Sequence, residues 1–553
     1  MTAGRGRIVA VLVALIAIVW FANLDARRLI RPDEGRYAEL AREMAETGDW
    51  ITPRLNGIKY FEKPPLQYWI TAGAYRAFGV DEWTARLWPA TAGALTVLLV
   101  WRTGRRQFGT VAGDRAGLVA AGMLWMAANA HLNTLDMGFT FWLIAGVAAF
   151  LTAQRDHATD RERRNGMWLA WAACAGAVMS KGLAGLVLPG GAIFFYLLAS
   201  RDWKFLGRLH LLSGVAIVLA LCAPWFVAVS IANPEFPDFF FVREHFQRYL
   251  TTVHRRTEPW WYFLPLLVAG TLPWTALAAR SVWRPWRADP VGARFRPRLF
   301  LACWCAFVLL FFSASSSKLP SYILPIFPAV AWLMGDRLDR TAPRALMWTA
   351  AAMVPLAIAA GVIGLNADRW ATKQTPVALY QAFEPWIVAA AASIMAGSLA
   401  AMWLARRERV TAAVATLSIA GLVAWQLAIT GHDALSPSFS SYQLASQVRG
   451  KLRAECPLYS VRTYEQTLPF YLGRTTTLVE FEDEMAFGLE REPQLAVRRL
   501  DDFVAQWQAA PCAYALLEPS LHDELVARGL RMDVMARDTR RVIAGKPATE
   551  IRP

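Results

Sequence analysis

The chain has 553 residues, of which 56% are hydrophobic, with 25 Trp and 29 Phe, and its formal net charge is +15. Apolar stretches of about 20 residues recur until about residue 430, and each is long enough to cross a hydrocarbon layer about 30 Å thick. Because a backbone in lipid must satisfy its own hydrogen bonds, these stretches predict helices and exclude an ordinary soluble domain. No basic and aromatic residues form the pattern of a nucleic-acid groove, so we expect no nucleic-acid partner.

Thirteen membrane-spanning helices are predicted. Lys and Arg concentrate in short loops on alternate sides of them, for example at residues 102–106, 155–164 and 337–344. Short basic loops stay in the cytoplasm, which predicts a cytoplasmic amino terminus and a carboxyl terminus on the outer side. The predicted spans are residues 8–24, 83–101, 115–131, 136–153, 167–180, 183–199, 210–231, 259–279, 299–314, 320–335, 344–365, 385–405 and 410–430.

The first outer loop, residues 25–82, places charged and aromatic residues beside the membrane. It contains the sequences RPDEGRY at residues 31–37 and YFEKPP at residues 60–65. Two amphipathic helices, residues 33–47 and 65–78, are predicted to lie in the plane of the membrane surface, because each has an apolar face and ends before a glycine. Charge beside a bilayer usually serves substrate or ion chemistry, with a solvated surface loop as the alternative.

Other outer segments also carry charged residues. The second large loop, residues 232–258, embeds Glu244, His245 and Arg248 among aromatic residues. Glu244 and Arg248 are four residues apart and could form a plain surface ion pair, and His245 could equally be a packed polar residue. Lys181 and Lys318 lie at short outer turns, where a lysine can also merely extend to the lipid headgroups.

Together these residues predict a phosphate site at the membrane surface. Four cations fall on the same side of the membrane near span ends: Lys63, Lys181, Arg248 and Lys318. With Tyr322 they could surround a phosphate, which favours several charge-assisted hydrogen bonds at once. The carboxylates on the same side are Asp33, Glu62 and Asp136. Asp136 could instead cap its helix, but a site with both signs of charge suits the transfer of a phosphate-linked group.

These stretches resemble the bacterial aminoarabinose transferase family (ArnT), which belongs to the GT-C fold membrane glycosyltransferases that use polyprenyl-phosphate sugar donors. The resemblance runs from residue 32 to about 335 in the family's order. The matching sequences are PDE at 32–34, RYAE at 36–39, YFEKP at 60–64, LD at 135–136, KG at 181–182, EH at 244–245, QR at 247–248, WY at 261–262, LPW at 272–274, KLP at 318–320 and YIL at 322–324.

The resemblance implies a GT-C type α-helical enzyme of the bacterial inner membrane. Such an enzyme moves 4-amino-4-deoxy-L-arabinose from undecaprenyl phosphate to a lipid A phosphate at the periplasmic face. The modification masks negative charge and gives resistance to polymyxin and other cationic antimicrobial peptides. We expect a monomer surrounded by membrane lipids. We expect no nucleotide cofactor, since the sequence contains no Walker or Rossmann motif.

Roles for the site residues follow from this implied reaction. The expected ligands of the donor phosphate are Lys63, Arg248, Lys181, Tyr322 and Lys318, because cations stabilise the charge that grows on the leaving group. Asp33 and Asp136 are the expected catalytic carboxylates beside the sugar. A general base is not required, since a lipid A phosphate is already mostly ionised at neutral pH. Arg36 and Arg31 could contact the acceptor phosphate or lipid headgroups.

A divalent metal ion is a further expectation. Glu62 and His245 offer a carboxylate and an imidazole, a pair that suits zinc. Two ligands are fewer than a closed structural site needs, so water, substrate phosphate or Asp33 would have to complete the coordination.

The last part of the chain, residues 432–553, is predicted to be a periplasmic α/β domain that follows a transmembrane domain of residues 1–431. Short apolar runs at 458–461, 476–479 and 513–517 predict strands, and residues 492–508 and 520–527 predict helices. Cys456 and Cys512 each precede a predicted strand. An oxidising periplasm permits a disulfide between them, and two unpaired cysteines are the alternative.

Two rival functions remain open from the sequence. One is a protein O-mannosyltransferase or another sugar transferase that uses the same kind of donor lipid. The other is a lipid flippase or transporter, against which the polar residues cluster on one face of the membrane and not at its midplane.

Overall fold

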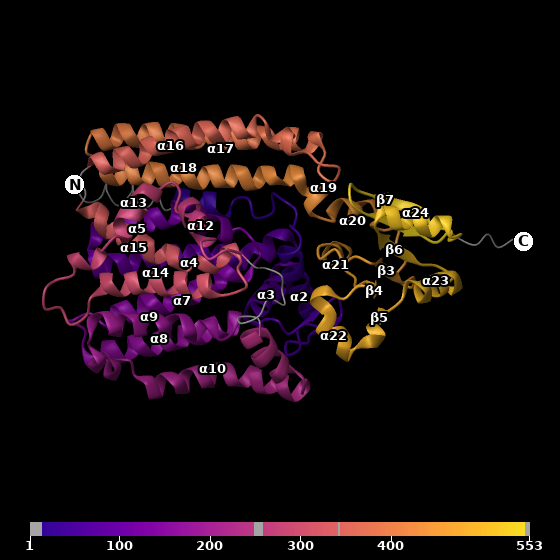
Figure 1. Cartoon of the computed structure of the whole chain (residues 1–553), viewed down its shortest axis with the longest axis horizontal. Helices are drawn as coiled ribbons and strands as arrows, with labels where there is room; N and C mark the ends of the chain where they lie inside the picture. Colours follow the sequence, from indigo (N-terminus) through magenta and orange to yellow (C-terminus); the bar gives the residue numbers. More distant parts are fainter. Residues whose placement is uncertain (1–13, 248–257, 341–342, 548–553) are drawn as a thin grey trace, which may run out of the picture.

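The structure is a long helical bundle with a smaller domain of helices and strands at one end (Figure 1). The computed structural model describes residues 14–247, 258–340 and 343–547, without the side chains of residues 244–247. In this part, six helices are long and apolar enough to cross a membrane by length and composition, or seven if one bent pair counts as a single span. Leu212 on α10 and Trp348 on α16 are among many exposed apolar side chains, as expected for a surface in contact with lipid. The chain is a multi-pass membrane protein.

Twelve of the thirteen predicted spans overlap helices of the bundle. The first predicted span, residues 8–24, is described only from residue 14, and residues 14–21 are helical. The total of thirteen stays a prediction. The bundle helices are α4 (Glu82–Phe108), α5 (Thr110–Gly122), α6 (Leu124–Ala130), α7 (Leu135–Ala153), α8 (Asp160–Lys181), α9 (Ala184–Ser200), α10 (Leu211–Ala232), α12 (Phe263–Gly270), α13 (Thr275–Val282), α14 (Pro297–Ala314), α15 (Ile326–Asp339), α16 (Pro343–Gly364), α17 (Val377–Arg406) and α18 (Val410–Gly431).

Two predicted spans are broken, which the apolar pattern did not indicate. The span predicted at 115–131 divides at Met123 into α5 and α6. The span predicted at 259–279 bends by 116° between α12 and α13. The two breaks meet, because the backbone N–H of Leu124 donates to the carbonyl of Leu272 at 2.9 Å. Each break therefore satisfies a backbone group that would otherwise be unpaired at membrane depth.

The first outer loop contains both predicted helices and an unpredicted hairpin. The helices are α2 (Asp33–Thr47), which ends at Gly48 with φ 74°, and α3 (Leu66–Phe78). Between them lies the hairpin of β1 (Arg54–Leu55) and β2 (Ile58–Lys59). The predicted apolar residues Leu40 and Met44 of α2 are buried, and the charged residues Glu39 and Arg42 are buried as well. The C-terminal domain covers this polar face, and a Cβ on Gly35 would come within 2.7 Å of the Thr467 backbone.

The C-terminal domain is built on a six-stranded mixed sheet with the strand order β5-β4-β3-β6-β8-β7. The strands are β3 (Leu458–Val461), β4 (Thr477–Val479), β5 (Ala496–Val497), β6 (Tyr514–Leu517), β7 (Asp533–Arg537) and β8 (Val542–Gly545). The helices are α19 (Ser436–Phe439), α20 (Tyr442–Val448), α21 (Leu468–Leu472), α22 (Ala486–Arg491), α23 (Leu500–Ala509) and α24 (Pro519–Ala527). The predicted strands β3, β4 and β6 are present. Residues 492–508 are not one helix, because β5 occupies residues 496–497 and the helix α23 begins only at Leu500.

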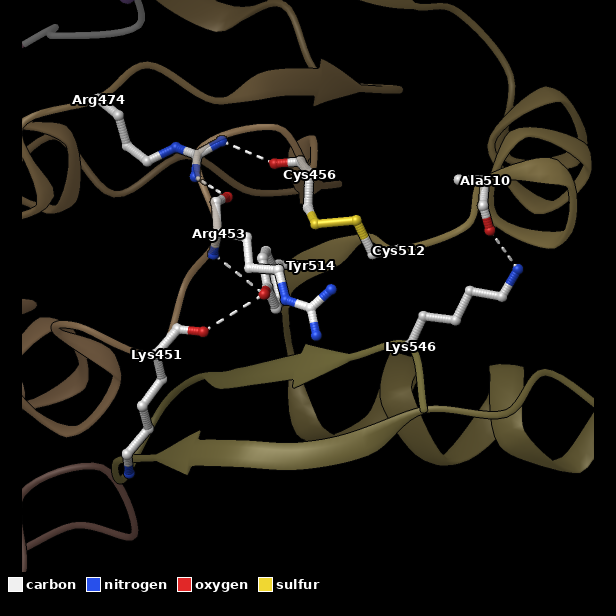
Figure 2. Close-up of a disulfide and its surroundings, with 8 residues drawn as sticks. All are labelled: Lys451, Arg453, Cys456, Arg474, Ala510, Cys512, Tyr514 and Lys546. Atoms are coloured by element: carbon white, nitrogen blue, oxygen red, sulfur yellow. Dashed lines mark hydrogen bonds between the residues drawn. A yellow bond between two sulfur atoms is a disulfide. The ribbon is translucent and has the colours of Figure 1, made fainter. Parts of the chain in front are cut away.

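Cys456 and Cys512 form a disulfide, with Cα atoms 5.4 Å apart (Figure 2). Each cysteine lies two residues before a strand, and these strands, β3 and β6, are parallel neighbours that pair Leu458 with Tyr514. The carbonyl of Cys456 also accepts a hydrogen bond from Arg474 at 2.8 Å. Of the two alternatives left open by the sequence, the disulfide is confirmed.

The first outer loop and the C-terminal domain share one hydrophobic core. Leu29, Leu40 and Met44 of the loop belong to the same buried cluster as Leu444 and Leu468 of the domain. The two segments lie at opposite ends of the chain, yet neither buries its apolar face without the other. They form one body at the end of the bundle, where Figure 1 shows α2 and α3 facing α21 and α22.

Candidate active site

A cavity of about 1030 Å³ lies between the bundle and the C-terminal domain. Its walls come from the first loop, the facing ends of bundle helices and the segment of residues 483–490. Seven of the eleven predicted site residues line it, namely Asp33, Arg36, Glu62, Lys63, Asp136, Lys181 and Tyr322. The fold thus gathers residues that the sequence spreads over almost three hundred positions.

A buried ion cluster next to the cavity fixes the start of α2. Glu34 is only 2% exposed and forms salt bridges with Arg27 at 2.5 Å and Arg86 at 2.9 Å. It also accepts a hydrogen bond from the backbone of Asn133 at 2.9 Å. Burial alone would raise the pKa of Glu34, but the two guanidinium groups outweigh it and hold this pKa well below its usual range. The cluster joins α2 to α4 and to the turn before α7. Of these helices, α2 carries Asp33 and α7 carries Asp136, the two expected catalytic carboxylates.

On the cavity side of α2, Arg36 connects Asp33 to the C-terminal domain. Its guanidinium donates to Asp33 at 2.6 Å and pairs with Glu484, which also accepts a hydrogen bond from Gln466 at 2.9 Å. Burial opposes the charge on Arg36, but neighbouring Tyr60 and Glu484 raise its pKa above its ordinary value, so it stays charged. Burial raises the pKa of Glu484, against the opposing effect of Arg36.

The second expected carboxylate, Asp136, pairs with Lys181 across the cavity wall. Asp136 lies in the first turn of α7, whose N-cap residue is Thr134, so the alternative of a helix cap is not what the structure shows. The Lys181 ammonium also lies 4.8 Å from the ring centre of Tyr322, a distance at which a cation is attracted to an aromatic face. The three predicted residues form one group.

The segment before α3 contributes the third group. Lys63 and Glu62 both line the cavity, and the Lys63 ammonium donates to the backbone carbonyl of Glu62 at 2.7 Å. Tyr60 lies buried behind them, and burial raises its pKa, with the charge of Glu62 as the next cause. Lys63 therefore places a positive charge on the cavity wall, where it can attract an anion.

Two predicted phosphate ligands lie outside the cavity. Lys318 is buried and donates to the carbonyls of Ser315 at 2.6 Å and Glu258 at 2.9 Å, which uses its donors to close a turn. Arg31 packs against the C-terminal domain, where burial and the charge of Arg540 lower its pKa. The structure therefore does not bring Lys318 or Arg31 into the cavity.

Arg248 and the side chain of His245 lie outside the described residues, so their predicted roles stay predictions. The described part of the chain contains no group of three or more His, Cys, Asp and Glu side chains that could hold a metal ion. Glu62 lines the cavity, as does Asp33, which was expected to complete the coordination if needed. The zinc ion stays a prediction.

The C-terminal domain supplies cavity residues that sequence reasoning missed, among them Asp483, Glu484, Phe487 and Glu490. A signal was present, since residues 480–484 read EFEDE in a chain with a net positive charge. Phe487 stacks on Phe239 of the second outer loop with ring centres 4.0 Å apart, which joins that loop to the domain. A second part of the cavity wall that the sequence did not predict consists of Trp125 and Asn129 of α6 and Trp425 of α18.

The arrangement suits the cleavage of a bond between a sugar and a phosphate. Lys63 and Lys181 can bind the phosphate and stabilise the charge that it gains as a leaving group. Asp33 and Asp136 can stabilise positive charge that develops on the sugar. Because the cavity opens at the end of membrane helices, a substrate with a long apolar chain can present its polar head here without leaving the bilayer.

Comparisons with known sequences match two separate segments of the chain. Residues 444–546 match the family described as "Aminoarabinose transferase C-terminal domain", and residues 62–227 match "Dolichyl-phosphate-mannose-protein mannosyltransferase". Among curated relatives, undecaprenyl phosphate-alpha-4-amino-4-deoxy-L-arabinose arabinosyl transferase 2 of Pseudomonas fluorescens is 35% identical over 59% of this chain and 55% of its own. The corresponding transferase of Aeromonas salmonicida is 34% identical over 57% of both chains. The chain thus aligns with somewhat more than half the length of these curated relatives.

Solved structures extend the comparison to the whole chain. The archaeal oligosaccharyltransferase AglB of Archaeoglobus fulgidus shares the fold, with a TM-score of 0.50 at 13% identity over 91% of this chain and 69% of its own. The crystal structure of ArnT from Cupriavidus metallidurans bound to undecaprenyl phosphate matches with a TM-score of 0.94 at 38% identity over 100% of both chains.

Fold and site together define a membrane protein of the GT-C fold. The full-length similarity is more specific, and the chain belongs to the aminoarabinose transferase (ArnT) family.

Proposed function

We propose that this protein transfers 4-amino-4-deoxy-L-arabinose from undecaprenyl phosphate to a phosphate of lipid A. The observation that carries the proposal is the cavity, which combines Lys63 and Lys181 with Asp33 and Asp136 at the end of the membrane helices. Named relatives transfer this sugar, and an ArnT structure that matches the whole chain holds undecaprenyl phosphate. In the reaction the bond between the anomeric carbon and the donor phosphate breaks, and an oxygen of the acceptor phosphate bonds to that carbon.

We also propose the bacterial inner membrane as the location, with the cavity and the C-terminal domain on the periplasmic side and the chain acting as a monomer. The basic short loops support this orientation. The disulfide between Cys456 and Cys512 supports an oxidising compartment for the C-terminal domain. Both lipid substrates carry apolar chains, which agrees with a cavity at membrane level.

The direct test incubates the purified protein in detergent with undecaprenyl-phosphate-aminoarabinose and lipid A, followed by mass spectrometry of the lipid A. We expect a mass gain of one aminoarabinose. Lys63→Gln should lower the rate about 100-fold or more, since removing one electrostatic contact to the transition state costs about 10²–10³ in rate. Lys59→Gln is the matched control, because Lys59 lies in the same loop and pairs with Glu235. No transfer by the wild type with a competent donor would overturn the proposal.

A protein O-mannosyltransferase is the second candidate, because residues 62–227 match that family. The aminoarabinose transferase match of residues 444–546 favours the first. The two differ in acceptor, since a Ser or Thr hydroxyl must lose a proton during transfer and a phosphate at neutral pH need not. Incubation with a mannosyl donor and a Ser/Thr-rich peptide should give no product.

A further inference from the structure

One wall of the cavity contains no charged side chain and has no role in the chemistry described so far. It consists of Trp125, Ala128 and Asn129 of α6, Leu132 just after it, and Trp425 of α18. The charged residues of the cavity come from other elements. The uncharged wall therefore does not attract phosphate, and its chemistry points to a different part of a substrate.

The polar groups of this wall have unused hydrogen-bonding capacity. The indole N–H groups of Trp125 and Trp425 are buried and have no partner among the described residues. Asn129 is only 6% exposed, and its amide N–H donates to the carbonyl of Trp125 at 2.8 Å, while its oxygen accepts no hydrogen bond from the described part of the chain. Buried polar groups without partners destabilise a fold, so a cluster of them beside a cavity needs an explanation.

The backbone beneath this wall is irregular in the same place. The break between α5 and α6 at Met123 lies next to Trp125, and Leu124 is joined to Leu272 in the break between α12 and α13. A Cβ on Gly270 would lie 2.9 Å from the Cβ of Trp125, so α12 packs directly against the wall. Broken helices at membrane depth are found where they line a cavity that binds a ligand.

The cavity is at the large end of the range for ligand pockets. Ligand pockets usually measure about 300–1,000 Å³, and this one measures about 1030 Å³. The donor phosphate and sugar are drawn to the Lys63, Lys181 and Asp136 side of the cavity by charge. The space beside Trp125 and Trp425 remains for the second substrate.

We propose that the wall formed by Trp125, Asn129 and Trp425 binds the glucosamine ring of lipid A that carries the acceptor phosphate. This inference rests on the proposed function and assigns the acceptor to one side of the cavity. Indole rings offer flat apolar surface to the carbon face of a sugar, and their N–H groups donate to its oxygens. The Asn129 oxygen accepts from a sugar hydroxyl or amide N–H.

The test uses Trp125→Phe, Trp425→Phe and the double variant, which keep an aromatic ring and remove the N–H. Initial rates are measured with lipid A varied at saturating donor, and with the donor varied at saturating lipid A. The double variant should raise the KM for lipid A at least tenfold and leave the KM for the donor within twofold. The matched control is Trp142→Phe, because the buried Trp142 N–H also lacks a partner among the described residues and does not line the cavity.

Binding measurements keep the result unambiguous. All variants should retain the increase in melting temperature that undecaprenyl phosphate produces, which shows that they are folded. Lipid A alone should raise the melting temperature of the wild type and of Trp142→Phe, but not of the double variant. This binding measurement tests the acceptor site even if no sugar transfer is detected. A rise in the donor KM instead, or an unchanged response to lipid A, would overturn the inference.

Discussion

Asp33 and Glu34 are neighbours in the sequence, carry the same charge and lie in opposite environments. The side chain of Asp33 is 50% exposed, faces the cavity and has Arg36 as its ion-pair partner. Glu34 is 2% exposed and is held by both Arg27 and Arg86. The first turn of α2 places one carboxylate at the cavity and the next inside the protein. Two adjacent residues of one charged motif can therefore differ, so that one lines a cavity and the other fixes the helix that carries it.

The positions of the two groups are linked. Glu34 fixes the start of α2, where Asp33 lies, and contacts Asn133 in the turn before α7, where Asp136 lies. A disturbance of the buried cluster should therefore move both expected catalytic carboxylates, whereas a change at Asp33 should leave the buried cluster intact.

The largest effect is expected on stability from Glu34→Gln. Removing one partner of a buried ion pair leaves uncompensated charge and costs about 3–5 kcal/mol, and here two guanidinium groups lose their carboxylate. The free energy of unfolding, measured by denaturant titration in detergent, should fall by this amount. The matched control is Asp33→Asn on the same helix turn. An unchanged midpoint for Glu34→Gln would contradict the structural role.

A comparable effect, but on activity, is expected from Asp33→Asn. Loss of one group that stabilises the transition state should lower the rate about 10²–10³-fold, or about 3–4 kcal/mol. The melting temperature should hardly change, because the side chain is half exposed. Product formation is followed by mass spectrometry of lipid A across a range of pH. If Asp33→Asn keeps substantial activity at any pH, Asp33 is not the catalytic residue.

A smaller effect is expected on stability when the pH is lowered. The pKa of Glu34 in the folded protein lies below its ordinary value of 4.5, so the unfolded chain binds more protons as the pH falls below that value. The stability from Glu34 is present above pH 4.5 and is lost below it, by up to about 1.4 kcal/mol per pH unit. Glu34→Gln should flatten this part of the curve of stability against pH. Equal slopes in both proteins would show that other groups cause the acid sensitivity.

The smallest effect is expected from Glu46→Gln, at the other end of α2. Glu46 pairs with Arg42 at 2.5 Å and is 55% exposed, and the buried Arg42 keeps Glu39 as a second partner. The loss should therefore be about 0.3–0.5 kcal/mol, as for a surface pair with this spacing. The free energy of unfolding and the transfer rate should both stay close to those of the wild type. A loss as large as that of Glu34→Gln would mean that burial does not separate the two glutamates.

The sequence by itself determined the features that depend on local signals. Apolar length and basic loops indicated a multi-pass membrane protein, and the glycines at positions 48 and 79 marked the ends of α2 and α3. The strands β3 and β6 were predicted from short apolar runs, so the pairing of Cys456 with Cys512 could be proposed as one of two alternatives. Family motifs then named seven of the residues that line the cavity.

Tertiary structure alone decided what each charged residue does. The carboxylates of Glu34 and Asp33 differ in what packs around them. Lys63 lines the cavity, whereas Lys318 is held by the carbonyls of Ser315 and Glu258 outside it. The breaks at Met123 and between α12 and α13, and the approach of residues 483–490 to the cavity, depend on contacts between segments far apart in the chain. Such contacts set burial, charge pairing and access to substrate, which no local pattern of residues contains.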